Sequence, residues 1–201
     1  MTLKERQDAL EKIKEEVLVL KNALVDQRLK NSMFPVIGDG KHNAEIMFVG
    51  EAPGANEAKQ GKPFVGASGK FLNVLLAHVG LEREDVYITN IVKDRPPENR
   101  DPTAAEIDAY GPFLDRQIDI IQPKVIATLG RFSMEYVMKR FKMDDQIEPI
   151  SKAHGKAYVT KASYGKVNIV PLYHPAVALY NGGMRPVLQK DFQILKQYAK
   201  K

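Results

Sequence analysis

The chain has 201 residues, of which 44% are hydrophobic and 27% charged, and it contains no cysteine. This length suffices for an α/β domain with a sizeable core, and we expect residues 1–201 to form a single domain. The lack of cysteine excludes disulfides and thiolate ligation of zinc or of an iron–sulfur cluster. The net charge of +5 fits a polyanion-binding protein, although many other enzymes are equally basic.

No segment has the pattern of a membrane protein. No apolar run is long enough to cross a bilayer. Residues 1–15 are charged throughout and lack the apolar core of a signal peptide. We therefore expect a cytoplasmic, monomeric protein without a membrane partner.

Residues 1–34 contain no glycine or proline and are expected to form one long amphipathic helix. Its apolar residues recur at spacings of three and four: Leu10, Ile13, Val17, Leu20 and Leu24. Such a stripe indicates a helix that packs on the sheet or forms a short dimer seam, rather than a ligand-binding element.

Beyond residue 34, predicted strands alternate with predicted helices. Apolar, β-branched runs predict strands at 44–49, 86–92, 125–129, 157–160 and 167–173. Helical spacing of apolar residues predicts helices at about 68–79, 103–121, about 131–141 and, last in the chain, about 187–198. This alternation predicts an α/β fold, a three-layer α/β/α sandwich with a central, mostly parallel sheet.

The loop at residues 50–66, GEAPGANEAKQGKPFVG, connects the first strong strand to a helix that has Ser68 as its expected N-cap. Open α/β sheets bind ligands at the carboxyl ends of their strands, where this loop lies. Its four glycines let backbone amides approach a ligand closely. The loop also holds two carboxylates, Glu51 and Glu57, and one aromatic ring, Phe64.

Two further strand ends carry polar side chains. Asn90 and His174 each follow an apolar strand directly. Taken singly, the first is as well explained as a turn residue and the second as a solvent-facing imidazole. Together with the 50–66 loop they form a site with an amide, an imidazole, two carboxylates and an aromatic ring. A basic rim surrounds it, formed by Lys93, Arg95, Arg100 and Arg185.

This set of side chains suits a flipped pyrimidine. An aromatic ring can stack on the base, and a side-chain amide can pair with O4 and N3–H of uracil. An imidazole or a backbone N–H can bind O2, where negative charge grows as the N-glycosidic bond breaks. A carboxylate can hold or deprotonate the attacking water.

Three segments resemble the family-four uracil-DNA glycosylases: GEAPGANEAKQGKPFVG, TNIVKDRPPENRDPT at 89–103 and YHPAVALY at 173–180. The resemblance extends from about Val36 to about Tyr198. It implies the three-layer fold predicted above. It also implies a hydrolase that removes uracil from single- or double-stranded DNA by base flipping and so starts base excision repair.

By motif position, the resemblance assigns roles to the residues. The implied uracil-binding residues are Glu51, Ala52, Phe64, Asn90 and His174. The implied catalytic residues are Glu51, Glu57, Asn99 and His174. The expected DNA contacts are Lys93, Arg95, Arg100, Leu179, Tyr180 and Arg185, with Leu179 and Tyr180 as the wedge that enters the duplex. Ala52 stands where other branches of the superfamily carry a catalytic aspartate, so it stays open which group positions the water.

The family normally holds a four-iron four-sulfur cluster on four cysteines, and this chain departs from it. Asp94 and Tyr110 stand at two of those positions, and the other two fall near Ala23 and Asp26. We therefore expect no cluster and no metal. We expect the four residues to lie together, with Arg28 as the basic partner of Asp94.

Two alternatives stay open at this point. One is a DNA-damage-binding protein that kept the pocket but has no activity. The other is a glycosylase for a different deaminated base such as hypoxanthine, which would need a wider pocket. The joint presence of Glu51, Glu57 and Asn99 favours the uracil-releasing enzyme.

Overall fold

The computed structural model describes residues 1–198. The helices are α1 (Leu3–Leu18), α2 (Ala23–Lys30), α3 (Ala55–Gln60), α4 (Ala67–His78), α5 (Ala104–Ile121), α6 (Arg131–Arg140), α7 (Ile150–Ala153), α8 (Val177–Tyr180) and α9 (Arg185–Phe192). The strands are β1 (Asp39–Gly40), β2 (Ile46–Gly50), β3 (Tyr87–Asn90), β4 (Val125–Leu129), β5 (Tyr158–Ala162) and β6 (Gly165–Leu172). None of the described helices is long and apolar enough to cross a membrane.

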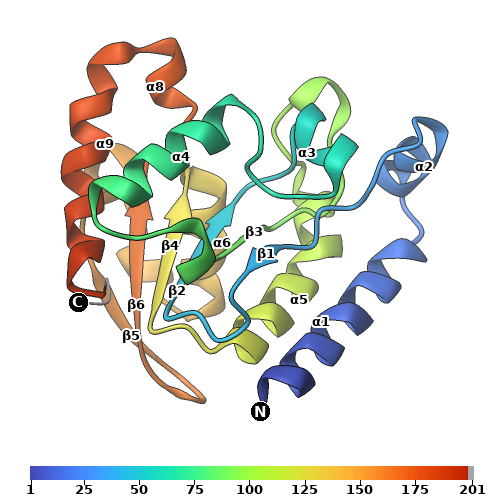
Figure 1. The fold of residues 1–201 in the computed structure, drawn as a ribbon, viewed down its shortest axis with the longest axis horizontal. Helices are drawn as coiled ribbons and strands as arrows, with labels where there is room; N and C mark the ends of the chain where they lie inside the picture. Colours follow the sequence, from blue (N-terminus) through green and yellow to red (C-terminus); the bar gives the residue numbers. More distant parts are fainter. Residues whose placement is uncertain (199–201) are drawn as a thin grey trace.

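The strands form a single sheet in the order β1-β3-β2-β4-β6-β5 (Figure 1). The four central strands are parallel, and the short edge strands β1 and β5 are antiparallel to their neighbours. Because β2 is followed by β3 on one side and later by β4 on the other, the strand order reverses at β2. Such a switch point opens a crevice at the carboxyl ends of the strands.

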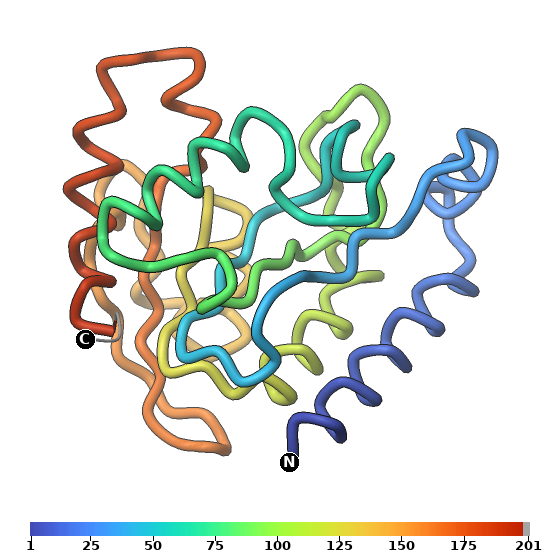
Figure 2. Tube along the Cα trace, in the orientation of Figure 1, coloured from blue at the N-terminus to red at the C-terminus, as the bar shows by residue number. Residues whose placement is uncertain are grey.

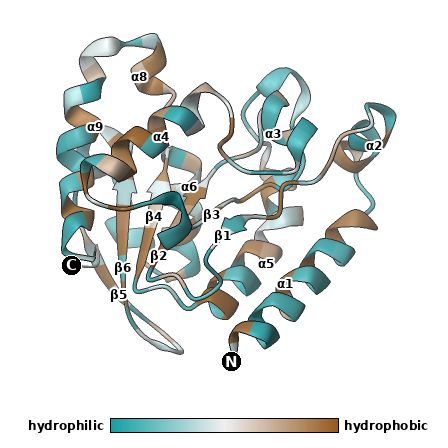
Figure 3. Ribbon diagram, viewed as in Figure 1, coloured by the Kyte–Doolittle hydropathy of each residue, from teal (hydrophilic) through white to brown (hydrophobic). Residues whose placement is uncertain are grey.

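Helices cover both faces of the sheet, which confirms the predicted three-layer α/β/α fold. One face packs against α1, α5 and α6, and the other against α4 and α9. In Figure 2 the N-terminal segment runs beside α5, on which α1 packs. Figure 3 shows brown along β6 and large teal areas on α1 and α9, as expected for a buried strand and amphipathic helices.

The prediction of one long N-terminal helix is wrong, because the segment forms two helices, α1 and α2. The Asn22 side chain accepts a hydrogen bond from Val25 N at 3.0 Å and thereby caps the start of α2. An asparagine that bonds to the nearby backbone in this way favours a helix start over helix continuation. The side chain of Arg28 on α2 then donates to the Leu18 carbonyl at the end of α1, at 2.9 Å.

The start of α5 follows a local signal, and the start of α4 does not. A capping box of Thr103 and Glu106 is present at the start of α5, where the sequence predicts a helix. The N-cap of α4 is Gly66 rather than Ser68, and no side chain caps this helix. The Glu57 carboxylate binds the Val65 and Gly66 amides, which fixes the chain just before the helix begins.

Candidate active site

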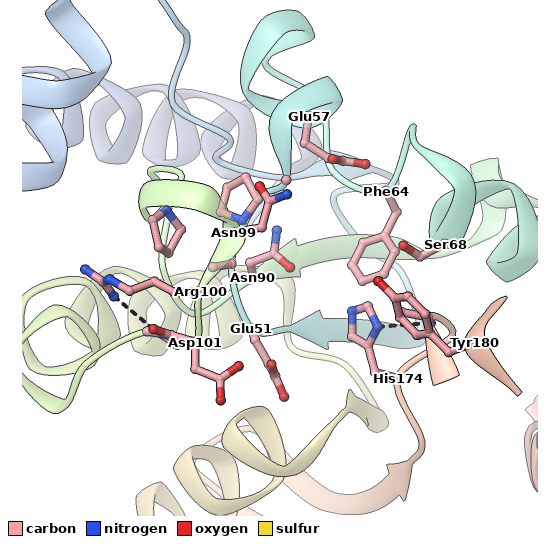
Figure 4. A pocket seen from close by; sticks show the side chains of 16 residues that line it. Glu51, Glu57, Phe64, Ser68, Asn90, Asn99, Arg100, Asp101, His174 and Tyr180 are labelled. Atoms are coloured by element: carbon pink, nitrogen blue, oxygen red, sulfur yellow. Dashed lines mark hydrogen bonds between the residues drawn. The ribbon is translucent and has the colours of Figure 1, made fainter. Parts of the chain in front are cut away.

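A pocket of about 250 Å³ opens at the carboxyl ends of β2, β3 and β6. This is smaller than the roughly 300–1,000 Å³ of pockets for drug-sized ligands and suits a single base. Its lining includes Glu51, Ala52, Gly54, Glu57, Phe64, Ser68, Asn90, Asn99, Arg100, Asp101, His174 and Tyr180. Figure 4 shows Phe64, His174 and Tyr180 on one side, Asn99, Arg100 and Asp101 on the other, and Asn90 between them.

Asn90 is the last residue of β3 and pairs in register with Gly50, the last residue of β2. Its side chain is only 1% exposed, and within residues 1–198 neither Oδ1 nor Nδ2 has a hydrogen-bond partner. Buried amides are almost always paired, and an unpaired one destabilises the fold. Both the donor and the acceptor of the Asn90 amide are therefore available to a molecule in the pocket.

Phe64 provides the aromatic wall of the pocket. Its ring centroid lies 5.6 Å from that of His174, at 31°. Its backbone has a positive φ of 50°, which is uncommon for a residue with a side chain. The Arg83 guanidinium bonds to the carbonyls of Pro63 and Phe64 and so holds this conformation. The role of Arg83 was not predicted, since an arginine nineteen residues away gives no local signal.

Glu57, at the start of α3, holds the other side of this loop. Its Oε1 accepts from Val65 N at 2.9 Å and from Gly66 N at 2.7 Å. The carboxylate also lines the pocket, so it reaches the same space as Asn90 and Phe64. This geometry gives Glu57 a positioning role for Phe64, in addition to any direct contact with a ligand.

The imidazole of His174, just after β6, is oriented by a local hydrogen bond. Its Nδ1 accepts from Ala176 N at 3.1 Å, which leaves Nε2 to carry the proton of the neutral ring. Burial lowers the pKa of His174 to about 4, and the Glu57 carboxylate only partly opposes this shift. At neutral pH the ring is therefore an uncharged hydrogen-bond donor at the pocket wall.

Glu51 follows β2 and lies near the N-terminus of α6, where Oε1 accepts from Phe132 N at 3.4 Å. Burial raises the pKa of Glu51 to about 7, and the negative charge of Asp101 adds to the rise. A carboxyl group with this pKa can take up a proton near neutral pH, as a general base must. Asp101 was not among the predicted residues, although it lies within the RPPENRDPT segment.

Asn99, Arg95 and Arg100 belong to the loop after β3. Asn99 has a positive φ of 57°, and its Oδ1 accepts from Arg95 Nε at 2.7 Å. Arg100 is exposed and binds both carboxylate oxygens of Glu106, at 2.6 and 2.9 Å. The loop therefore brings one amide and one exposed guanidinium to the mouth of the pocket.

Lys93 does not contribute to the basic rim, and its prediction as a DNA contact is wrong. Its side chain is fully buried, and Nζ bonds to the backbone carbonyl of Asn90 at 2.6 Å. The chain continues to pair with the segment after β2 at Ile91 and Val92, which turns the next side chain inward. A group at this depth cannot reach a phosphate.

The remaining predicted DNA contacts lie on the surface. Leu179 and Tyr180 on α8 are 42% and 90% exposed, and Tyr180 lines the mouth of the pocket. Large exposed apolar and aromatic side chains at this position suit a wedge. Arg185 is exposed too, but it is outside the pocket lining, and its guanidinium carbon lies 5.4 Å from the Phe71 ring centroid.

Comparison with known proteins identifies the family of the chain. The profile described as "Uracil DNA glycosylase superfamily" matches residues 37–198. The chain belongs to the uracil DNA glycosylase superfamily. It is 51% identical over 193 residues to the type-4 uracil-DNA glycosylase of Sulfurisphaera tokodaii, covering 96% of this chain and 86% of that protein. It is 48% identical over 158 residues to the type-4 uracil-DNA glycosylase of Archaeoglobus fulgidus, covering 79% of this chain and 78% of that protein.

The resemblance to family-four members of the superfamily implies an iron–sulfur cluster, and the residues at its positions do not fit one. The Asp94 carboxylate binds Arg28 Nη1 at 2.9 and 3.0 Å and accepts from Tyr110 Oη at 2.6 Å. Both oxygens are thereby engaged within a buried ion pair. Across the described residues, no group of three or more histidine, aspartate or glutamate side chains is arranged to hold a metal ion.

Ala23, Asp26, Asp94 and Tyr110 were predicted to lie packed together, and only Asp94 and Tyr110 do so. Arg28 pairs with Asp94 and Tyr110 lies beside it, as expected. The hydrogen bond from Tyr110 Oη to Asp94 was not predicted, and Asn22 Oδ1 also lies 3.4 Å from Tyr110 Oη. Ala23 and Asp26, however, are exposed on α2. On α2 it is therefore the buried Arg28, and not Ala23 or Asp26, that contacts Asp94.

Proposed function

We propose that the protein is a monofunctional glycosylase that hydrolyses the N-glycosidic bond of uracil in DNA and so initiates base excision repair. The single observation that carries the proposal is the buried, unpartnered Asn90 amide in a pocket large enough for one base. Uracil offers an acceptor at O4 and a donor at N3–H, which together satisfy that amide. Cytosine presents a donor where O4 would be, so the same amide orientation would be mismatched.

The geometry supports a separate role for each pocket side chain in binding a flipped base. Phe64 stacks on the ring, and Asn90 pairs with O4 and N3–H. His174 donates its Nε2 proton to O2 while remaining neutral, because its pKa is about 4. This hydrogen bond strengthens as charge grows on the departing base, so it acts chiefly on the transition state.

In the chemical step, the bond from C1′ to N1 breaks and its electron pair leaves with the base. A water oxygen forms the new bond to C1′, and Glu51 takes the water proton. The pKa of Glu51, about 7, suits this role near neutral pH. Asn99 and Glu57 border the same space, the first as a candidate water ligand and the second as the anchor of the Phe64 loop. The products are free uracil and an abasic site.

We further propose that the enzyme works as a monomer, without a metal or an iron–sulfur cluster, on uracil in single- or double-stranded DNA. Arg95, Arg100 and Arg185 would contact phosphates, and Leu179 and Tyr180 would fill the gap left by the flipped base. Among the pocket-lining residues there is no lysine to act as a Schiff-base nucleophile, so backbone cleavage is not expected.

The test is base release from oligonucleotides that contain uracil, hypoxanthine, xanthine or thymine, in single and double strands. Free uracil should appear, and the DNA backbone should stay intact until alkali or heat is added. Strand cleavage without such treatment would contradict the monofunctional mechanism. Tight binding of uracil-DNA without release would instead support a damage-binding protein, and release of hypoxanthine alone would indicate a different substrate.

A further inference from the structure

Lys93 is a buried amine that lies directly behind the base-reading amide. Its side chain is 0% exposed. Nζ donates to the Asn90 carbonyl at 2.6 Å, to Gln117 Oε1 at 2.6 Å and to Thr89 Oγ1 at 2.9 Å. Since the Asn90 side chain itself has no partner within the described residues, its position depends on how its backbone is held.

The hydrogen-bond network around Lys93 indicates the protonation state of its amine. Of the acceptors near Thr89 Oγ1, the Ile37 carbonyl at 2.6 Å is closer than Gln117 Oε1 at 3.2 Å and the Asn90 carbonyl at 3.5 Å, so we assign its one hydrogen to Ile37. Thr89 Oγ1 then accepts from Lys93. Gln117 Nε2 donates to the Ile37 carbonyl and to Tyr87 Oη, which turns Oε1 toward Lys93 as an acceptor. Three acceptors require three N–H groups, which only the ammonium form has.

This ammonium has no counter-charge in the part of the chain that the structure describes. The neighbouring carboxylate, Asp94, is bound to Arg28. Burial lowers the pKa of Lys93 well below its usual value, and the three hydrogen bonds that Nζ donates favour the charged form against that shift. An unpaired buried cation destabilises a fold, so its retention behind Asn90 calls for a compensating gain elsewhere.

We propose that Lys93 is a positioning residue that holds the Asn90 backbone and places a buried positive charge behind the pocket to favour departure of the base as an anion. The inference rests on the proposed glycosylase function. As the bond from C1′ to N1 breaks, the electron pair moves onto N1 and O2 of the base. A fixed cation in a poorly solvated site stabilises that charge more strongly than it would in water, and it needs no reorganisation.

The test compares two leaving groups in the parent and in Lys93→Met, which keeps the length of the side chain and removes its charge. Fluorine withdraws electrons, so 5-fluorouracil leaves as an anion with less help than uracil. Under single turnover, the variant should release uracil roughly tenfold or more slowly. It should release 5-fluorouracil with less than about a threefold loss, because less charge stabilisation is then required. DNA affinity and its salt dependence should not change, since Lys93 does not reach the surface.

Gln117→Glu tests the same idea in a chain that keeps Lys93, which matters if Lys93→Met fails to fold. A carboxylate at this position would pair with the ammonium and cancel its charge in a side chain of the same size, although it loses the hydrogen bond that Nε2 donates to the Ile37 carbonyl. It should reproduce the selective loss of uracil release. The matched control is Thr128→Val, which alters another fully buried polar side chain, on β4, whose hydroxyl has no partner among residues 1–198. That variant should release both bases at the parental rate.

Equal losses for uracil and 5-fluorouracil in the variants would show a purely structural role and overturn the inference. Parental rates on both bases in Gln117→Glu would overturn it as well. A parent protein that releases neither base would instead refute the glycosylase function, which separates the two failures.

Discussion

The guanidinium of Arg28 and the carboxylate of Asp94 form a buried ion pair that joins the N-terminal helices to the loop after β3. Nη1 lies 2.9 Å from Oδ2 and 3.0 Å from Oδ1, and the two side chains are 3% and 0% exposed. The same guanidinium bonds to the Leu18 carbonyl at the end of α1, and Tyr110 of α5 donates to Asp94. Four segments therefore meet where the family-four resemblance implies an iron–sulfur cluster.

Truncation of Tyr110 tests whether this contact holds the fold together. Tyr110→Ala empties a fully buried aromatic site and should lower the free energy of unfolding by about 3–5 kcal/mol. Tyr110→Phe keeps the ring and removes only the hydrogen bond to Asp94, so a loss of about 1.5–3 kcal/mol is expected. Urea denaturation followed by circular dichroism measures both. An alanine variant as stable as the parent would show that the segments are held in another way.

The protein should be colourless and should bind no iron, because the chain has no cysteine and Asp94 is already occupied by Arg28 and Tyr110. Elemental analysis after purification in the presence of iron and sulfide tests this directly. Prolonged treatment with chelators should change neither the melting temperature nor the rate of uracil release. Stoichiometric iron, or inactivation by a chelator, would refute the expectation.

Substitutions at Asn90 and His174 should separate recognition from chemistry. Asn90→Asp places a carboxylate opposite O4 of uracil and should weaken excision, while His174→Ala removes a donor to O2. For His174→Ala we expect a rate about 10²-fold lower or more, with DNA affinity largely unchanged, because the hydrogen bond strengthens only in the transition state. Single-turnover rates and equilibrium binding on the same oligonucleotide distinguish the two effects. Parental rates in both variants would remove these residues from the mechanism.

The pH dependence of uracil release should report Glu51. Its pKa is raised to about 7, and a base must be ionised, so kcat/KM should rise with pH and level off above about 7. His174 stays neutral throughout this window, because its pKa is about 4. Glu51→Gln should be about 10²-fold slower or more and should lose the ascending limb. The same limb in Glu51→Gln would assign the titration to another group.

The raised pKa of Glu51 also has a consequence for stability. A carboxyl whose pKa is higher in the folded state favours folding at low pH, and this contribution is lost as the pH rises through about 7. Glu51→Gln, which cannot ionise, should therefore unfold at a higher temperature than the parent above that pH. If Glu51→Gln and the parent melt at the same temperature both above and below about pH 7, the pKa of Glu51 is not raised in the folded enzyme.

Salt dependence should identify the phosphate contacts. Arg100 is exposed at the pocket mouth, so Arg100→Ala should weaken binding to all DNA sequences and reduce the slope of log K against log salt by about one. Arg95→Ala should also slow excision, because Arg95 Nε holds the Asn99 side chain. Titrations at several salt concentrations, with and without uracil in the DNA, test both. An unchanged slope for Arg100→Ala would exclude this contact.

The layered fold and the core of the candidate site could be predicted from the sequence. Short apolar runs alternate with helical patterns, and that alternation requires a mostly parallel sheet covered on both faces. Because parallel strands end at the same edge, Glu51, Asn90 and His174, which follow β2, end β3 and follow β6, must lie near one another. Periodicity and strand order are local properties, so they can be read from the chain alone.

Which side chains turn inward, and which groups they contact there, could not be predicted without the folded structure. From the sequence, Lys93 is predicted to be a surface cation beside Arg95. In the structure it is buried, and its Nζ bonds to Gln117 on the distant helix α5. Arg83 holds the Phe64 loop without any signal in its own neighbourhood. Such partners are distant in sequence, and burial of a polar group is tolerated only where the packed chain supplies hydrogen bonds. Whether a polar side chain finds hydrogen-bond partners when buried depends on the complete fold, because no local sequence pattern predicts which distant groups will face each other.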